Sequence, residues 1–261
     1  MKLALTAAFL MLAYPALAQE TGNPLEPSET WDVDLRESVL GLDAEPPIDP
    51  ALLDLAAPVR ADDAALVPLR ITQPEGAPAL DAVTVVIDQN PAPVAAEFQL
   101  GQAMAPLDFE IRVRVDAYSD VRVIGNPEGD APVMAGRFIK ASGGCSAPAG
   151  KDMAAVADTM GEMRWKTAAE GDRNIGTLMI RHPNFSGLQR DQVTLLTIPA
   201  HFIDTLEVRQ GEDLLFTMSA GISISEDPVF RFAYEPNGQP ISVHAEDTDG
   251  NSWDQTFDAA G

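Results

Sequence analysis

The chain has 261 residues and carries 40 acidic side chains against 17 Lys and Arg, a formal net charge of −23. This excess of negative charge makes nucleic acid and anionic membrane surfaces poor partners, whereas a basic protein surface would be attracted. One cysteine is present, so no disulfide can form within the chain. Without the leader described next, the length suits two domains of about 100 residues each.

The first 18 residues have the organisation of a secretory signal peptide. Lys2 precedes an apolar run, and Ala16-Leu17-Ala18 fits the small-x-small rule for cleavage. We expect cleavage after Ala18 and a periplasmic location. The run is too short for a stable membrane span, and no later stretch is long and apolar enough for one, so no membrane partner is expected.

Residues 19–57 are predicted to form a leader that contains a short helix. Thr30 can cap this helix, and apolar residues recur along it with a helical spacing. Prolines then punctuate the chain before the first strands. The apolar stripe consists of Trp31, Leu35, Val39 and Leu42.

Residues 58–140 are predicted to form a first β-sandwich. Apolar residues alternate with polar ones in several short runs, which is the two-residue period of a half-buried strand. Turns that contain proline and glycine separate the runs, a spacing typical of sandwiches. The runs lie at residues 83–87, 109–115, 121–123 and 133–141.

Residues 174–261 are predicted to form a second sandwich, again from short strands. Asn237-Gly238 between two apolar runs is a strong hairpin signal. The strand candidates lie at residues 177–181, 200–209, 214–218, 229–234 and 241–245.

Residues 141–173 would join the two sandwiches through a cysteine-bearing arm and a linker helix. Methionine and tryptophan residues between 151 and 166 follow a roughly helical spacing, and Gly171 would end the helix. The predicted fold class is therefore all-β, with two β-sandwiches joined by a glycine-rich, cysteine-bearing crossover and a short helix.

Cys145 lies in a stretch of small residues, Ser142-Gly143-Gly144-Cys145-Ser146-Ala147-Pro148-Ala149-Gly150. Glycine and proline disfavour regular structure here, and the small neighbours would leave the sulfur unshielded. We interpret the stretch as a flexible, exposed arm that presents a thiol; the alternative is an ordinary linker. The predicted arm residues are Gly143, Gly144, Ser146, Ala147, Pro148 and Gly150. In an oxidising compartment the thiol would either link two chains in a disulfide homodimer or act as a reactive group.

Several motifs resemble two subunits of the thiosulfate-oxidising system. The run from Ile87 to Phe98, IDQNPAPVAAEF, followed by strands that end in Gly143-Gly144-Cys145, resembles SoxY. The runs RHP, SGLQRD and PAHFI, which begin at Arg181, Ser186 and Pro199, resemble its partner SoxZ. In SoxY the cysteine ends the chain, whereas here it is internal. The fused order resembles the SoxYZ-like carriers associated with quinoprotein dehydrogenases.

The resemblance implies two immunoglobulin-like sandwiches packed as an internal heterodimer, and a carrier rather than an enzyme. Cys145 would hold a sulfur-containing intermediate covalently and present it to periplasmic redox or sulfur-processing enzymes, such as a quinoprotein dehydrogenase system or a c-type cytochrome. No cofactor beyond this covalent sulfur adduct is expected, and no catalytic residue is assigned. The alternative is a two-sandwich adaptor or assembly module for a periplasmic quinoprotein dehydrogenase, in which Cys145 carries no substrate.

An enzymatic alternative would pair Cys145 with a histidine as nucleophile and base. His182, His201 and His244 are the candidates. His182 lies in a His-Pro turn and His201 begins a strand, so we interpret both as structural. One cysteine and no closely spaced histidine pair argue against zinc, and no glycine-rich phosphate loop is present. We therefore predict no metal site.

Overall fold

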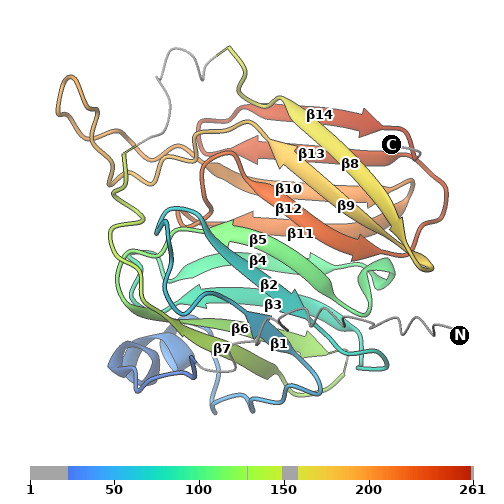
Figure 1. Cartoon of the computed structure of the whole chain (residues 1–261), viewed down its shortest axis with the longest axis horizontal. Helices are drawn as coiled ribbons and strands as arrows, with labels where there is room; N and C mark the ends of the chain where they lie inside the picture. The colour runs from blue at the N-terminus through green and yellow to red at the C-terminus, as the bar shows by residue number, and fades with distance from the viewer. Residues whose placement is uncertain (1–22, 128, 149–157, 260–261) are drawn as a thin grey trace, which may run out of the picture.

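The computed structural model describes residues 23–127, 129–148 and 158–259. The predicted signal peptide lies outside these residues. Within them the strands form two antiparallel sheets that pack as two layers (Figure 1). No helix in this part of the chain has the length and hydropathy to cross a membrane.

Each sheet contains strands from both halves of the chain. In sheet order, the six-stranded sheet consists of β1 (Asp54–Ala56), β2 (Val67–Thr72), β5 (Asp108–Val113), β12 (Val229–Tyr234), β9 (Arg173–Ile180) and β8 (Met163–Glu170). The eight-stranded sheet consists of β14 (Ser252–Phe257), β13 (Ile241–Asp247), β10 (Ile203–Gln210), β11 (Asp213–Ala220), β4 (Val94–Leu100), β3 (Leu80–Ile87), β6 (Ser119–Pro127) and β7 (Val133–Ile139).

The two halves are sandwiches joined edge to edge. One junction pairs β4 with β11 over five residues of each strand, from Ala96 to Leu100 on β4. The other pairs β5 with β12 at only two positions, Glu110 and Phe109 on β5. Strand edges left open are prone to unwanted pairing, and this arrangement closes four of them. The all-β prediction of two β-sandwiches is confirmed, and Figure 1 shows the two halves side by side in shared layers.

The hydrophobic core runs through the junction without a break. Phe98 and Phe109 of the first half pack against Phe216 of the second, with ring centroids 6.2 and 5.3 Å from that of Phe216. The two-residue period explains why these strands form: Leu69 and Ile71 of β2 are fully buried, while Arg70 between them is exposed. The shared aromatic core fixes the position of one half relative to the other.

The predicted linker helix is wrong where the structure describes it. Residues 149–157 lie outside the described part, but Met163–Glu170 is strand β8, paired with β9. Met163 and Trp165 pack on the core two positions apart, so the apolar spacing fits a strand as well as a helix. Gly171, with φ of +63°, makes the turn to β9 rather than ending a helix.

The leader carries a helical element before the first strand. It is a π-helix, η1 (Trp31–Val39), from which Trp31 and Leu35 pack against Val86, Ile124 and Met134. Val39, although part of the predicted stripe, is 54% exposed. A short 3-10 helix, η2 (Gln102–Met104), follows β4.

Candidate functional site

The cysteine stretch is docked against the first sandwich. We call residues 141–148 the Cys segment. Its backbone donates from Gly143 to the carbonyl of Asp116 at 2.7 Å and from Gly144 to the carbonyl of Val115 at 3.1 Å. A Cβ at Gly144 would collide with the carbonyl oxygen of Ala64. The backbone of the first half, just beyond β5, therefore receives this segment so closely that only glycine fits at position 144.

The loop between β9 and β10 holds the same segment from the other side. Ser186 Oγ donates to the carbonyl oxygen of Cys145, and Gln189 Nε2 donates to that of Ala147 at 2.9 Å. Both side chains are buried. The segment thus lies between the two halves and is hydrogen-bonded to each.

Arg114 connects the segment to both halves. It follows β5, is 2% exposed, and donates to the carbonyls of Gly144 at 3.3 Å and Asn184 at 3.4 Å. Its Nε has no hydrogen-bond partner among the described residues. Burial lowers the pKa of Arg114 from its usual value, yet an arginine remains charged at neutral pH. A buried cation therefore lies beside the backbone of the cysteine.

The thiol itself is fully buried, so the prediction of an unshielded sulfur is wrong for this conformation. Cys145 is 0% exposed, whereas Ser146 and Pro148 on either side of Ala147 are exposed. The amide of Cys145 donates to Asp116 Oδ1 at 3.1 Å. Burial, and next the charge of Asp116, raise the pKa of the thiol to about 12, against an opposing effect of Arg114. The role of Cys145 as an attachment point stays a prediction.

A cavity of about 590 Å³ adjoins the Cys segment. Ala147 and Pro148 form part of its wall, and Arg112 and Arg114 another part. Gly150, predicted as part of the arm, lies outside the described residues. Asp63, Glu226 and Asp227 also line the cavity, so it offers space and charges of both signs next to the segment.

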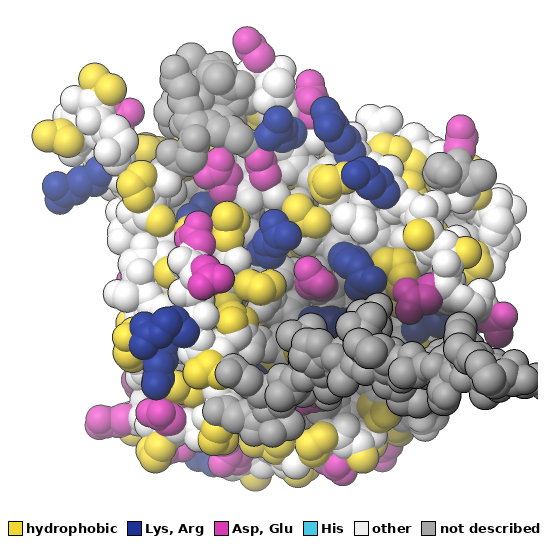
Figure 2. All heavy atoms as spheres, in the orientation of Figure 1, with side chains coloured by type: hydrophobic (Ala, Val, Ile, Leu, Met, Phe, Trp, Pro, Cys, Tyr) yellow, Lys and Arg dark blue, Asp and Glu magenta, His cyan; other side chains and the backbone are white. Residues whose placement is uncertain are grey.

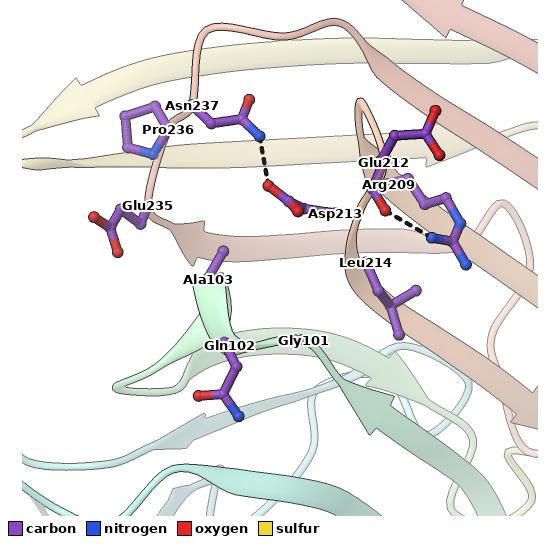
Figure 3. Close-up of a pocket in the computed structure, with 10 residues that line it drawn as sticks. All are labelled: Gly101, Gln102, Ala103, Arg209, Glu212, Asp213, Leu214, Glu235, Pro236 and Asn237. Carbon is purple, nitrogen blue, oxygen red and sulfur yellow. Dashed lines mark hydrogen bonds between the residues drawn. The ribbon is translucent and has the colours of Figure 1, made fainter.

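A second cavity, of about 630 Å³, lies at the opposite end of the β4–β11 junction (Figure 3). Asn237 Nδ2 donates to Asp213 Oδ2 at 2.8 Å, and Arg209 Nη1 donates to the carbonyl of Glu212 at 3.0 Å. Neither the cysteine nor a histidine is among the described residues that line it. Cys145 therefore does not border this cavity.

Two of the three histidines meet at one carboxylate. His182 Nε2 lies 3.3 Å and His201 Nε2 2.6 Å from Asp247 Oδ2. Burial lowers the pKa of His182, although the hydrogen bond with Asp247 opposes this. Burial also opposes ionisation of Asp247, but hydrogen bonds from Asn251 and His201 outweigh it and lower its pKa to about 2. This trio could hold a metal ion, since its ligand atoms all lie within 4.8 Å of one another.

His244 lies apart from this trio, on the exposed side of β13. It contacts Asp254 at 2.9 Å and Glu246 at 3.0 Å, and hydrogen bonds with these carboxylates raise its pKa. Among the described contacts, none joins a histidine side chain to Cys145. The structure therefore does not provide a nucleophile–base pair.

Sequence reasoning missed the residues that hold the segment. Ser186 and Gln189 belong to the run SGLQRD, but no role was predicted for them. A serine and a glutamine in a loop are ordinary residues, and their partners lie about 40 positions earlier in the chain. In the structure, the burial of both polar side chains within a loop indicates that they bind another part of the chain, here the Cys segment.

Comparison with known families divides the chain at the Cys segment. Residues 37–145 match the family model described as Sulfur oxidation protein SoxY, and residues 163–258 match Sulphur oxidation protein SoxZ. Both matches agree with the resemblance and its order. A search of curated proteins gave no match.

Among solved structures, similarity was found to a Parabacteroides merdae beta-glucuronidase with glycerol in its active site. The identity is 10%, the coverage 80% of this chain and 25% of that chain, and the TM-score 0.27. A second structure of that beta-glucuronidase gives 10% identity, 82% and 25% coverage and a TM-score of 0.25. The chain thus spans a quarter of those proteins, and at these TM-scores the likeness supports no argument.

Proposed function

We propose that this chain, in which a SoxY-like part precedes a SoxZ-like part, is a carrier in sulfur oxidation. It holds a sulfur-containing group covalently on Cys145 and presents the group to sulfur-processing enzymes in the periplasm. The observation that carries the proposal is that the SoxY match ends on Cys145, where residues of both halves converge on the segment. A carrier needs a single attachment point that can be held or released, and this is where the chain has its only thiol.

The docked segment suits storage rather than reaction. Thiolate is the reactive form of cysteine, and with a pKa of about 12 only about 10⁻⁵ of docked molecules carry it at pH 7. A fully buried sulfur is also out of reach of solvent. Docking thus shields the thiol from unwanted oxidants, and reaction requires the segment to leave its place.

Undocking has a moderate free-energy cost. Release of residues 145–148, with Gly143 and Gly144 left in place on the first half, breaks the hydrogen bonds of Cys145 with Ser186 and Asp116 and that of Ala147 with Gln189. At about 1 kcal/mol net for each, these bonds contribute about 3 kcal/mol, which leaves on the order of 1% of molecules undocked. The population is small enough to protect the thiol and large enough for a partner enzyme to capture.

The attachment step needs an electron acceptor. When the thiol and a sulfur-containing anion such as thiosulfate form a new S–S bond, one proton and two electrons leave. The electrons pass to an oxidised partner, for which a c-type cytochrome or a quinoprotein dehydrogenase system is suited. The carrier supplies the thiol sulfur of the new S–S bond, and the partner accepts the two electrons.

The surface near the segment is suited to contact with a protein. The β9–β10 loop that contains Ser186 projects from the body (Figure 1) and bears Val193, Leu195 and Leu196, which are 90%, 69% and 69% exposed. Apolar side chains exposed together often mark an interaction site. On the face shown in Figure 2, basic and acidic side chains are interspersed rather than separated. The apolar loop tip therefore marks the end of the molecule where a partner would bind.

The test is the intact mass of the protein purified from its native cells without reductant. We expect free thiol, disulfide dimer and discrete sulfur adducts, with the last two removed by reductant. Cys145→Ser should abolish all adducts, whereas Ser142→Ala, a change of an exposed residue in the same segment, should retain them. A single unmodified mass under sulfur-oxidising growth, with full sulfur oxidation by Cys145→Ser cells, would overturn the proposal.

The second candidate is the adaptor for a periplasmic quinoprotein dehydrogenase, and the full burial of Cys145 favours it. In that case the thiol is a packing group and its chemistry is irrelevant. Cys145→Ser cells would then retain dehydrogenase activity, and deletion of the protein would abolish it. If the protein is a carrier, Cys145→Ser should cause the same loss of function as deletion of the protein.

A further inference from the structure

We propose that His182, His201 and Asp247 form a binding site for a divalent transition-metal ion of the zinc class. We call these three residues the His–Asp cluster. They come from different parts of the second sandwich: His182 follows β9, His201 precedes β10, and Asp247 ends β13. Two imidazoles and one carboxylate are ligands that zinc and its neighbours accept, and three protein ligands leave one position open.

The ligand atoms all lie within 4.8 Å of one another, and movement of the His201 ring would bring them to the spacing of an ion site. Around a tetrahedral ion with bonds of about 2.0–2.1 Å, ligand atoms lie about 3.3 Å apart. His182 Nε2 and Asp247 Oδ2 are already 3.3 Å apart. His201 Nε2 is 2.6 Å from the same oxygen, so its ring must retreat slightly. The His201 side chain is 17% exposed and lies on the open side of the cluster, where it has room to do so.

The His182 ring is held in place through its Nδ1. Its Nδ1 lies 2.7 Å from Asn184 Oδ1. That amide group is fixed, because its nitrogen donates to the carbonyl of Ser225 at 2.9 Å and its oxygen accepts from the amide of Ile203 at 3.0 Å. The Asn184 backbone amide donates to the same Nδ1 at 3.1 Å. Nδ1 thus faces one acceptor and one donor of Asn184, which hold the ring in place whether Nε2 donates to Asp247 or binds an ion.

A neutral ring with its proton on Nδ1 turns a bare Nε2 toward the Asp247 carboxylate. In this tautomer two acceptors face each other where His182 is 0% exposed, and a cation between them would take the place of the proton through which Nε2 otherwise bonds to Asp247. In metal sites the second nitrogen of a ligating histidine commonly donates to an oxygen in this way. Asn184 occupies that position here.

Asp247 is supported in the same manner. Its Oδ1 accepts from the amides of Asp249 at 3.0 Å and Asn251 at 2.9 Å, and Asn251 Nδ2 donates to Oδ2 at 2.8 Å. His201 Nδ1 in turn lies 3.5 Å from Asp249 Oδ2. Hydrogen bonds thus hold Asp247 and His182 in place, whereas His201, with one contact of 3.5 Å at its Nδ1, is the ligand that moves.

The test uses the mature full-length protein, stripped with chelator and titrated with ZnCl₂ by calorimetry. We expect one Zn²⁺ per chain and, at 100 times Kd, a rise of the melting temperature by about 5 °C or more. Co²⁺ should give the visible absorption of a four-coordinate ion. The variant is His201→Ala, which removes the ligand on the open side and should weaken binding at least 100-fold.

Two controls make the result specific. His244→Gln removes the histidine next to two exposed carboxylates and should bind Zn²⁺ as the unchanged protein does. Cys145→Ser should do the same, so that failure of the carrier function and failure of this site are distinguishable. If His201→Ala does not fold, His201→Gln retains a polar side chain toward Asp247 and replaces it.

Two results would overturn the site. One is no saturable Zn²⁺ binding and no thermal shift at millimolar Zn²⁺, which would make the trio a hydrogen-bonded structural cluster only. The other is binding that His201→Ala leaves unchanged while His244→Gln or Cys145→Ser abolishes it, which would place the ion elsewhere.

Discussion

The two halves of the molecule hold the Cys segment by different means. The first half provides a seat, which we define as Ala64, Val115 and Asp116; it acts mainly through backbone atoms at close range. The second half provides a latch, Ser186 and Gln189, which acts through side chains. Contacts with backbone atoms depend on the close fit of the segment, and substitution of the side chains that form the seat does not remove them. Side-chain contacts can be removed one at a time, so the latch is where docking is adjustable.

Breaking the fit to the seat should have the largest effect. Gly144→Ala places a Cβ against the carbonyl oxygen of Ala64, so we expect the segment to undock in most molecules. From an undocked population on the order of 1%, the rate of alkylation of Cys145 by iodoacetamide at pH 7.5 should rise about 100-fold.

The control for this change is Gly143→Ala. Gly143 has a φ of +76° but only Ser146 Oγ near its Cβ position, at 3.8 Å. Backbone strain of about 1 kcal/mol there should raise alkylation only about fivefold. Equal rates for the two alanine variants would show that close approach to the seat does not hold the segment.

The pH dependence of alkylation should also distinguish the docked segment from the undocked one. The folded-state pKa of the Cys145 thiol is raised from 9.0 to about 12, so docking is favoured fully below pH 9 and loses this contribution as pH rises toward 12. Docked protein should therefore react about twentyfold faster at pH 10.5 than at pH 9, because ionisation and undocking proceed together.

Gly144→Ala should change only about twofold over this interval, because an undocked thiol is half ionised near its ordinary pKa. Stopped-flow alkylation at several pH values measures both profiles. A profile of the unchanged protein that levels at pH 9 would mean that its thiol is not held in the buried position.

Removing the first side chain of the latch should have an intermediate effect. Ser186→Ala loses the hydrogen bond to the carbonyl of Cys145 and the one that Ser186 Oγ accepts from the amide of Leu188 at 3.2 Å. At about 1.4 kcal/mol for the buried carbonyl left without its partner, alkylation should become about tenfold faster. The exposed Val193→Ala in the same loop is the control and should alkylate at the rate of the unchanged protein.

Removing the second side chain of the latch should have the smallest effect. Gln189→Ala loses the bond to Ala147 at 2.9 Å and the one that Gln189 Oε1 accepts from the amide of Ser186 at 3.2 Å. Only the first reaches the Cys segment, and Ala147 is nearer to solvent than Cys145. A loss of about 1 kcal/mol predicts a rise of about fivefold in the alkylation rate. If Gln189→Ala exceeds Ser186→Ala, the segment opens from its Ala147 end rather than at the cysteine.

The strands could be predicted from the sequence because their signal is local. Leu69 and Ile71 alternate with exposed neighbours, and this period alone indicates a half-buried strand. Met163 and Trp165 show the limit of such signals. Over a short run, apolar residues two positions apart are compatible with a strand and also with the end of a helical pattern. Pairing with β9, a contact between strands, decided between them.

By itself, the sequence determined the all-β class, the order of a SoxY-like before a SoxZ-like part, and the single thiol at their boundary. These depend on residue types and local periodicity. The tertiary structure alone decided that Cys145 is buried and that His182 meets His201 and Asp247. The first-half groups that hold the Cys segment lie between 29 and 81 positions from Cys145, from Asp116 to Ala64. The burial of a side chain and the residues that meet at one site depend on such distant neighbours. The small residues next to Cys145 therefore could not indicate that it is buried.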